Sequence, residues 1–171
     1  MLSSSLSENE FHSYYKNYID LVEDSDIVNG LISSFKRTEA FFQTIPSEKL
    51  EFQYAPGKWT IKEIIQHLID AEIVFAYRAL RFAREDKTAL PGFDENHYAK
   101  TSHANNYSID KLIKHYGALR QTTIHLFESF SPETLLKTGN ASGSEMSIRA
   151  LGYVIIGHET HHSKIIRERY L

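Results

Sequence analysis

The sequence predicts an all-α protein, a four-helix bundle with an additional helix at its N-terminus. Apolar residues recur at three- and four-residue spacing through four long segments, as they do on one face of a helix. No segment sustains the alternation of apolar and polar residues that indicates a half-buried strand. All four prolines lie between the helical segments. The length of 171 residues fits one domain that can bury a core without disulfides.

Residues 1–25 are predicted to form an N-terminal helical extension, and residues 26–171 the bundle domain. Glu8–Val22 has apolar side chains at helical spacing, at Phe11, Tyr15, Tyr18 and Val22. The acidic cluster Glu23–Asp26 is expected to end this helix and to cap the next one. The first bundle helix then carries one apolar face and ends before Pro46; this face consists of Val28, Leu31, Ile32, Phe35 and Phe42.

The second bundle helix follows a turn at Ala55-Pro56-Gly57. Thr60 and Glu63 have the spacing of a capping box, in which the N-cap side chain and the third helical residue cap each other's backbone. The helix is expected to reach about Arg84. Its inner stripe consists of Ile64, Leu68, Ala71, Phe75 and Arg78.

The connection Glu85–Tyr107 is polar and about 23 residues long. A helix of about 25 residues measures only ~37 Å, whereas an extended chain covers ~3.3 Å per residue. The connection is therefore long enough to cross the whole bundle. We expect the helices on either side of it to run parallel.

Ser108 is expected to cap the third bundle helix, which runs to Phe130. A short turn follows at Ser131-Pro132-Glu133, and Lys137–Ser144 is expected to be a glycine-bearing loop. The last helix begins near Ser147 and runs almost to the end of the chain. Its inward residues are Leu151, Val154, Ile155, Ile165 and Ile166.

Composition excludes several functions. The 19 Lys and Arg against 22 Asp and Glu give a net charge of −3, which argues against a nucleic-acid partner. The absence of cysteine excludes disulfides, thiolate metal ligands and a cysteine nucleophile. No apolar run approaches the ~18–20 residues that span a bilayer, and Met1–Phe11 does not resemble a signal peptide. A cytoplasmic protein without a membrane partner is expected.

Three of the nine histidines are predicted to point into the bundle. His158 and His162 lie one helical turn apart on the apolar face of the last helix. His67 lies on the inner stripe of the second helix. Two imidazoles at this spacing can bind one metal ion, and three protein ligands leave coordination positions open, as in catalytic sites. The alternative is that these are core histidines without a ligand role.

A peptidase motif must also be considered, because His158-Glu159-Thr160-His161-His162 matches H-E-x-x-H, in which the glutamate is the general base. The match is short and occurs often by chance. Only nine residues follow His162, and the extended form of the motif is absent. The peptidase interpretation is therefore not favoured.

Together, three segments resemble the DinB-like superfamily. They are Trp59-Thr60-Ile61-Lys62-Glu63, His67-Leu68-Ile69-Asp70-Ala71-Glu72 and Gly157-His158-Glu159-Thr160-His161-His162. The resemblance covers about residues 26–170. It implies a four-helix bundle of up-down-down-up topology and a divalent metal, zinc or nickel among others, held by His67, His158 and His162. Relatives include S-transferases that use bacillithiol or a similar low-molecular-weight thiol, and a thiol-dependent isomerase.

The expected function is therefore a metal-dependent S-transferase or isomerase for a small electrophilic molecule, with a thiol cosubstrate. A bound metal deprotonates a thiol or lowers the pKa of water, so a hydrolase is an alternative. A non-enzymatic metal-binding bundle and a plain structural bundle are the others. A homodimer is expected, in which the Phe11–Val22 segment could pair with a second chain.

Several weaker candidates complete the predicted site. Arg78 and Arg169 recur on the helix faces of the histidines and could bind a substrate carboxylate, or else form ion pairs at the bundle ends. Asp70, Glu159 and His161 could orient the ligating imidazoles. The long connection could cover the site with residues Phe93, Asp94, Asn96, His97 and Tyr98.

Overall fold

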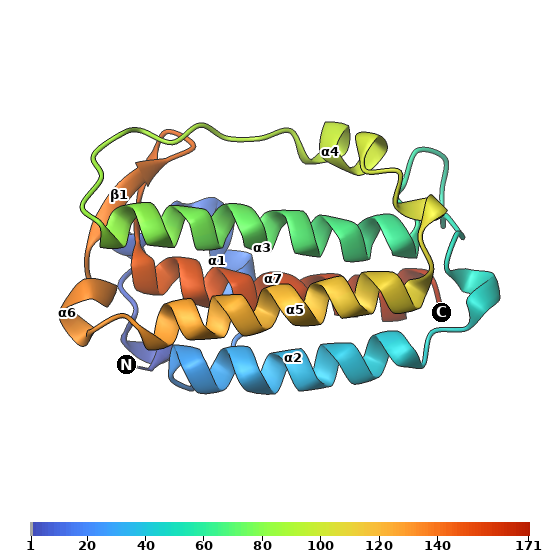
Figure 1. Ribbon diagram of the computed structural model, residues 1–171, viewed down its shortest axis with the longest axis horizontal. Helices are drawn as coiled ribbons and strands as arrows, with labels where there is room; N and C mark the ends of the chain where they lie inside the picture. Colours follow the sequence, from blue (N-terminus) through green and yellow to red (C-terminus); the bar gives the residue numbers. More distant parts are fainter. Residues whose placement is uncertain (1) are drawn as a thin grey trace.

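A computed structural model describes residues 2–171 and confirms the helical bundle. Its long helices are α2 (Ile27–Gln43), α3 (Ile61–Ala83), α5 (Ile109–Glu128) and α7 (Ile148–Arg169). Helices α2 and α7 run in one direction, and α3 and α5 run parallel to each other in the opposite direction (Figure 1). The up-down-down-up topology and the parallel pair are thus as predicted.

The helix starts are those that the capping residues predict. Thr60 and Glu63 form both hydrogen bonds of the capping box, and the Thr60 amide donates to Glu63 Oε2 at 2.7 Å. Asp26, Ser108 and Ser147 each accept a hydrogen bond from the backbone amide three residues later. These side chains satisfy amides that have no partner within the helix, so they fix where each helix begins.

The core is formed where the four helices face one another. Helix α7 packs against α2 and α3, and α5 packs against the same two helices. The interior is apolar over most of its length, with Leu31, Ile65, Leu151 and Val154 fully buried. None of the helices in residues 2–171 has the length and apolar character needed to cross a bilayer.

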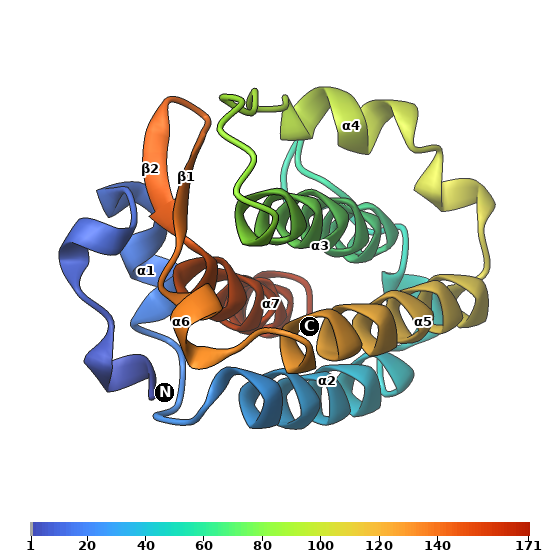
Figure 2. The same ribbon diagram turned by 60° about the vertical axis from the view of Figure 1, so that its left-hand side comes forward.

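The long connection crosses back over the bundle, as predicted (Figure 1). It contains the short helix α4 (Glu95–Thr101) and the 3-10 turn Ala104–Asn106, so it is not entirely irregular. Helix α4 packs on α3 (Figure 2). Near its start, the amide of Leu90 donates to the carbonyl of Asn140 at 3.0 Å, which joins the connection to a small hairpin.

That hairpin replaces the loop expected at Lys137–Ser144. After α6 (Pro132–Leu135), strand β1 (Thr138–Ala141) pairs antiparallel with β2 (Ser144–Ser147). Ser142 and Gly143 join the strands with φ values of 55° and 79°. Two residues with positive φ match the twist of a tight hairpin, which is why this short polar stretch forms strands.

The N-terminal extension is not the single helix predicted over Glu8–Val22. It consists of 3-10 turns at Ser3–Ser5, Glu8–Glu10 and Ser13–Tyr15, followed by the one-turn helix α1 (Lys16–Ile19). Ser7 and His12 accept hydrogen bonds from backbone amides two residues later, and Phe11 between them is extended. Side chains that cap the backbone locally compete with a continuous helix.

Helix α1 lies directly on α7, and Gly157 permits this contact. A Cβ at Gly157 would lie 2.0 Å from the carbonyl oxygen of Tyr18, so only glycine allows the two backbones to approach this closely. The N-terminal segment therefore packs against the bundle through α1.

Candidate metal centre

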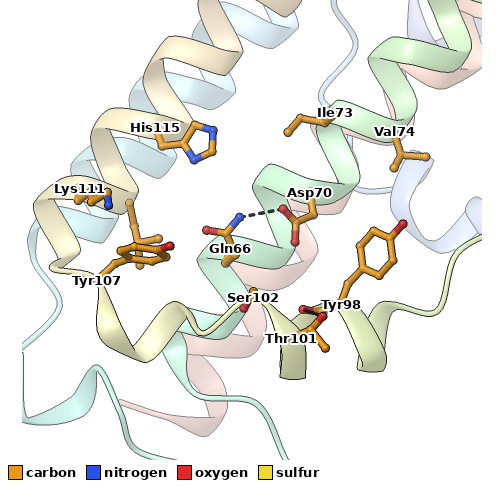
Figure 3. A pocket seen from close by; sticks show the side chains of 11 residues that line it. Gln66, Asp70, Ile73, Val74, Tyr98, Thr101, Ser102, Tyr107, Lys111 and His115 are labelled. Carbon is orange, nitrogen blue, oxygen red and sulfur yellow. Dashed lines mark hydrogen bonds between the residues drawn. The ribbon is translucent and has the colours of Figure 1, made fainter.

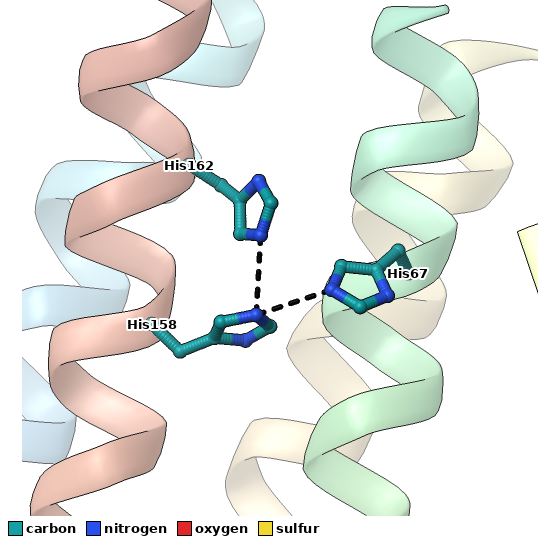
Figure 4. Close-up of side chains that lie close together, drawn as sticks. All are labelled: His67, His158 and His162. Carbon is teal, nitrogen blue, oxygen red and sulfur yellow. Dashed lines mark hydrogen bonds between the residues drawn. The ribbon is translucent and has the colours of Figure 1, made fainter. Parts of the chain in front are cut away.

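Three histidine side chains converge between α3 and α7. His158 Nε2 lies 3.1 Å from Nε2 of His67 and 3.1 Å from Nε2 of His162 (Figure 4). One nitrogen from each residue lies within 4.8 Å of the other two. The structure thus brings together the three residues that the sequence singled out as metal ligands.

Helix geometry explains the convergence. His158 and His162 are four residues apart, so both side chains leave the same face of α7 and His67 reaches them from the facing helix α3 (Figure 4). His67 and His158 are only 7% and 6% exposed, and His162 is half-buried. The positions are held by regular helices, which makes the geometry rigid.

Burial keeps these imidazoles neutral. It lowers the pKa of His67 to about 4. It also lowers the pKa of His158 and of His162 well below the ordinary value, and the neighbouring histidines add to the effect. At neutral pH each ring therefore has one nitrogen with a free lone pair, the form in which histidine binds a metal.

The donor set fits a divalent metal. Three neutral imidazole nitrogens are a ligand set used by zinc and nickel. Without an ion, each 3.1 Å contact between two Nε2 atoms must be a hydrogen bond in which one ring donates its N–H, because two lone pairs would repel each other. Nδ1 of His162 is buried and has no hydrogen-bond partner among the described residues. Clustered polar nitrogens in an apolar setting have an electrostatic cost that a bound cation would offset.

The three histidines line a cavity of about 550 Å³. This volume is within the usual range of small-molecule sites. The walls come from the N-terminal segment, α3, the long connection, the hairpin and α7. Besides the three histidines, the lining residues are His12, Tyr14, Tyr15, Tyr18, Trp59, Ala71, Phe75, Arg78, Gly92, Phe93, Glu95, Ala141, Ser142, Ser144 and His161.

Aromatic rings surround the histidine cluster. The ring centroid of Trp59 lies 4.7 Å from that of His67, and the centroid of Tyr18 lies 5.1 Å from that of His158. Phe75 meets His158 edge-on at 6.2 Å. Sequence reasoning did not assign Trp59, Tyr15 or Tyr18 to the site, because aromatic residues at helical spacing indicate a core equally well.

The two candidate arginines have different surroundings. Arg78 lines the cavity and is 2% exposed, with Nη2 donating to the Pro91 carbonyl at 3.0 Å and to Ser142 Oγ at 2.8 Å. Arg169 is exposed in the last turn of α7 and is not among the cavity residues. Arg169 is therefore separated from the site. A position on the same helix face as the histidines fixes the direction of the side chain, but not its distance from them along the helix axis.

Asp70 does not orient His67. Its carboxylate accepts a hydrogen bond from Gln66 at 2.8 Å in a second cavity of about 690 Å³ between α3, α5 and α4 (Figure 3). His115 and Tyr98 line that cavity as well. Residues three positions apart on an α-helix are rotated by 300° about its axis, so the side chain of Asp70 points 60° away from that of His67. This difference is enough to direct Asp70 towards a different neighbour.

Glu159 also has another partner. It is 1% exposed, and both of its carboxylate oxygens accept hydrogen bonds from Arg120, with Oε2 2.7 Å from Nη2. It also accepts a hydrogen bond from the hydroxyl of Tyr116. A general base must reach the substrate, so a carboxylate held in this buried ion cluster does not support the peptidase interpretation.

Other predicted residues are placed as follows. His161 is half-buried on the cavity wall, with its ring centroid 5.1 Å from that of Tyr18. Of the connection residues expected over the site, Phe93 lines the cavity, and the neighbouring Glu95 does so too. Asp94, Asn96, His97 and Tyr98 do not line it.

The fold and the cavity define a class: helical bundles with three histidines at the wall of a cavity. Residues 31–166 match the sequence profile of the DinB superfamily. The chain therefore belongs to the DinB superfamily, as the sequence resemblance indicated.

Individual relatives agree with this assignment. A protein of Geobacillus thermodenitrificans named "Putative metal-dependent hydrolase" is 27% identical over 118 residues, which cover 68% of this chain and 66% of the relative. The match thus spans just under two thirds of that relative's length. A protein of Bacillus mycoides with the same designation is 24% identical over 151 residues, covering 86% of this chain and 83% of the relative.

One solved structure shares the fold. YfiT from Bacillus subtilis, described as "a probable metal-dependent hydrolase with an unusual four-helix bundle topology", superposes with a TM-score of 0.75. The match covers 83% of this chain and 82% of YfiT at 14% identity. At this identity the likeness concerns the fold, in agreement with the parallel α3 and α5.

Proposed function

We propose that His67, His158 and His162 bind one divalent metal ion and that this protein is a metal-dependent enzyme acting on a small molecule. The observation that supports the proposal is the cluster of three Nε2 atoms at the wall of a 550 Å³ cavity. Zinc and nickel are the preferred ions because both bind neutral imidazole well. The open cavity beside the cluster favours an enzyme over a non-enzymatic metal-binding bundle or a purely structural one.

The first candidate reaction is thiol-dependent S-transfer or isomerisation on an electrophilic substrate. A divalent ion in such a site lowers the pKa of a bound thiol or water molecule. The chain has no cysteine, so the thiol would come from a cosubstrate such as bacillithiol. Trp59, Tyr18 and Phe75 would exclude water from the reacting groups, which strengthens electrostatic interactions there.

Metal-dependent hydrolysis is the second candidate. The designation of the relatives from Geobacillus and Bacillus favours it. Of the carboxylates near the histidines in sequence, Glu159 is bound to Arg120 and Asp70 lies in the other cavity. Glu95 lines the cavity of the histidines, so a hydrolytic mechanism would depend on the ion itself and on Glu95 or His161.

Metal content tests the shared part of both candidates. Wild-type protein purified without an affinity tag should hold about one divalent ion per chain by mass spectrometry. His67→Ala and His162→Ala should lose it, whereas His125→Ala, at an exposed position paired with Glu128, should not. A wild-type chain that binds no zinc, nickel or manganese after dialysis would refute the metal site.

Activity assays then separate the two reactions. Metal-loaded protein is assayed for conjugation of 1-chloro-2,4-dinitrobenzene with low-molecular-weight thiols, and for hydrolysis of nitrophenyl esters without thiol. Turnover that requires both thiol and His158 supports S-transfer, whereas thiol-independent turnover supports hydrolysis. Activity that survives in His67→Ala and His158→Ala would contradict both.

A homodimer remains a proposal, with one change to its expected surface. Phe11 is buried and Tyr18 packs on α7 within the same chain. These two side chains are therefore already used within the chain, whereas Leu2 and Tyr14 of the same segment are 49% and 60% exposed and are available to a second chain.

A further inference from the structure

Arg78 is a buried cation without an acidic partner. Its side chain is 2% exposed, yet no Asp or Glu in residues 2–171 forms an ion pair with it. Glu95 lines the same cavity near Tyr15 and Tyr18, but it forms no ion pair with Arg78. By contrast, the other fully buried arginine, Arg120, is paired with two carboxylates. Buried charges in proteins are normally paired because an isolated charge is costly to desolvate.

The groups that hold Arg78 are all neutral. Nη2 donates to the carbonyl of Pro91 and to the hydroxyl of Ser142, and Cζ lies 5.8 Å from the centre of the Phe75 ring. Tyr15 is nearby, but burial raises the pKa of its hydroxyl, so it stays protonated at neutral pH. These contacts fix the guanidinium in place without neutralising it.

Arg78 and the histidine cluster face the same cavity. The ring of Phe75 is close to both, with its centroid 5.8 Å from Arg78 Cζ and 6.2 Å from the ring centroid of His158. The guanidinium is therefore at most about 12 Å from the His158 ring. An extended di- to tetrapeptide covers a similar length, at ~3.3–3.6 Å per residue. One elongated small molecule can thus reach both groups.

We propose that Arg78 binds an anionic oxygen group of the substrate or cosubstrate, a carboxylate or a phosphate. Pro91 and Ser142 use the two N–H groups of Nη2, whereas the N–H groups of Nε and Nη1 are not used by them and can form charge-assisted hydrogen bonds with an anionic oxygen. The ligand is then an elongated anion whose apolar middle lies along Phe75 and the other aromatic walls, and whose far end reaches the histidines. The placement of the ligand's other end at the histidines rests on the proposed function, whereas the binding of its anionic group at Arg78 requires no metal.

Arg78 also has a structural role, because its hydrogen bonds join α3 to the hairpin and to the long connection. Arg169→Gln removes the same charge from an exposed position outside the cavity and is therefore the matched control. Arg78→Gln removes the charge and keeps hydrogen-bonding capacity. Arg78→Lys keeps the charge but has three N–H donors on one atom in place of five spread over a planar group.

Binding is measured on metal-free, chelator-treated protein. Trp59, the only tryptophan of the chain, lines the cavity and reports occupancy through its fluorescence. The probes are 4-phenylbutanoate, 3-phenylpropyl phosphate and the neutral 4-phenylbutanamide, at constant ionic strength. The two anions distinguish a carboxylate site from a phosphate site.

Wild-type protein should bind at least one anion about tenfold or more tightly than the amide, as expected for charge-assisted hydrogen bonds. Arg78→Gln should lose this preference and keep its affinity for the amide, whereas Arg169→Gln should keep the preference. Arg78→Lys should be intermediate. Circular dichroism establishes that each variant is folded.

Two results would overturn the proposal. One is a wild type without preference for either anion, a comparison that needs no variant. The other is a folded Arg78→Gln that retains the preference. Because the protein is metal-free, a failed metal-content test leaves this result intact, and the two proposals can fail separately.

Discussion

Replacing Arg120 by Met should destabilise the protein strongly. Arg120 is fully buried and donates to Glu72 through Nε and Nη2, both at 2.9 Å, and to Glu159 through Nη2 at 2.7 Å. It also donates to the carbonyl of Leu31 at 3.1 Å and to Ser34 Oγ at 3.3 Å. Methionine has similar length but no charge, so Arg120→Met would leave two buried carboxylates without a cation.

The expected loss is about 3–5 kcal/mol in the free energy of unfolding, the usual cost of breaking a buried ion pair from one side. For a chain of this size each kcal/mol lowers Tm by ~2–4 °C, so Tm should fall by roughly 6–20 °C. The triple variant Glu72→Gln, Arg120→Met, Glu159→Gln should be more stable than Arg120→Met alone, because it carries no buried charge.

The pH dependence gives a second test of the same reasoning. In Arg120→Met, burial raises the pKa of the orphaned carboxyls, so the folded state binds protons that the unfolded state releases. The difference in stability from wild type should therefore shrink as the pH falls from 8 towards 5.

Urea unfolding followed by circular dichroism measures these differences, with an unchanged m-value as the check on two-state behaviour. Arg37→Met is the control, since Arg37 forms an exposed pair with Glu23 and should change stability by less than about 1 kcal/mol. An Arg120→Met variant within about 1 kcal/mol of wild type at pH 8 would refute the reasoning.

Two further predictions concern the N-terminal wall and the histidines. Gly157→Ala should release the N-terminal segment from α7, because the new Cβ would meet the Tyr18 carbonyl. Amide hydrogen exchange should then become faster in residues 2–25 but not in the bundle, and unchanged exchange would contradict the contact. Metal-free protein should lose stability as the pH falls from about 6.5 to about 4. Below pH 6.5 the unfolded state protonates its histidines, whereas burial holds the pKa of His67 at about 4 in the folded state. That shift corresponds to about 3 kcal/mol in the free energy of unfolding, measured by denaturant unfolding at a series of pH values. His67→Leu should reduce the slope of the unfolding free energy against pH by about one proton, whereas His125→Ala should not.

The sequence alone determined the four bundle helices and the histidine pair. Capping residues such as Thr60 and Ser147 act on amides three residues away, so they fix helix starts without any tertiary contact. The four-residue spacing of His158 and His162 likewise places both rings on one face of any helix. The length of the connection that follows α3 was enough to predict that α3 and α5 run parallel.

Only the tertiary structure decided which groups surround the histidines. Glu159 and Asp70 are close to the histidines in sequence, but each turns to a different neighbour, Arg120 and Gln66. Tyr18 and Ser142 reach the cavity from segments whose local patterns predicted a plain helix and a loop. Periodicity fixes the direction of a side chain on its own helix, whereas its partner depends on which element packs opposite. That choice is made by contacts distant in sequence, such as the approach of α1 at Gly157 and the joining of the hairpin to the long connection.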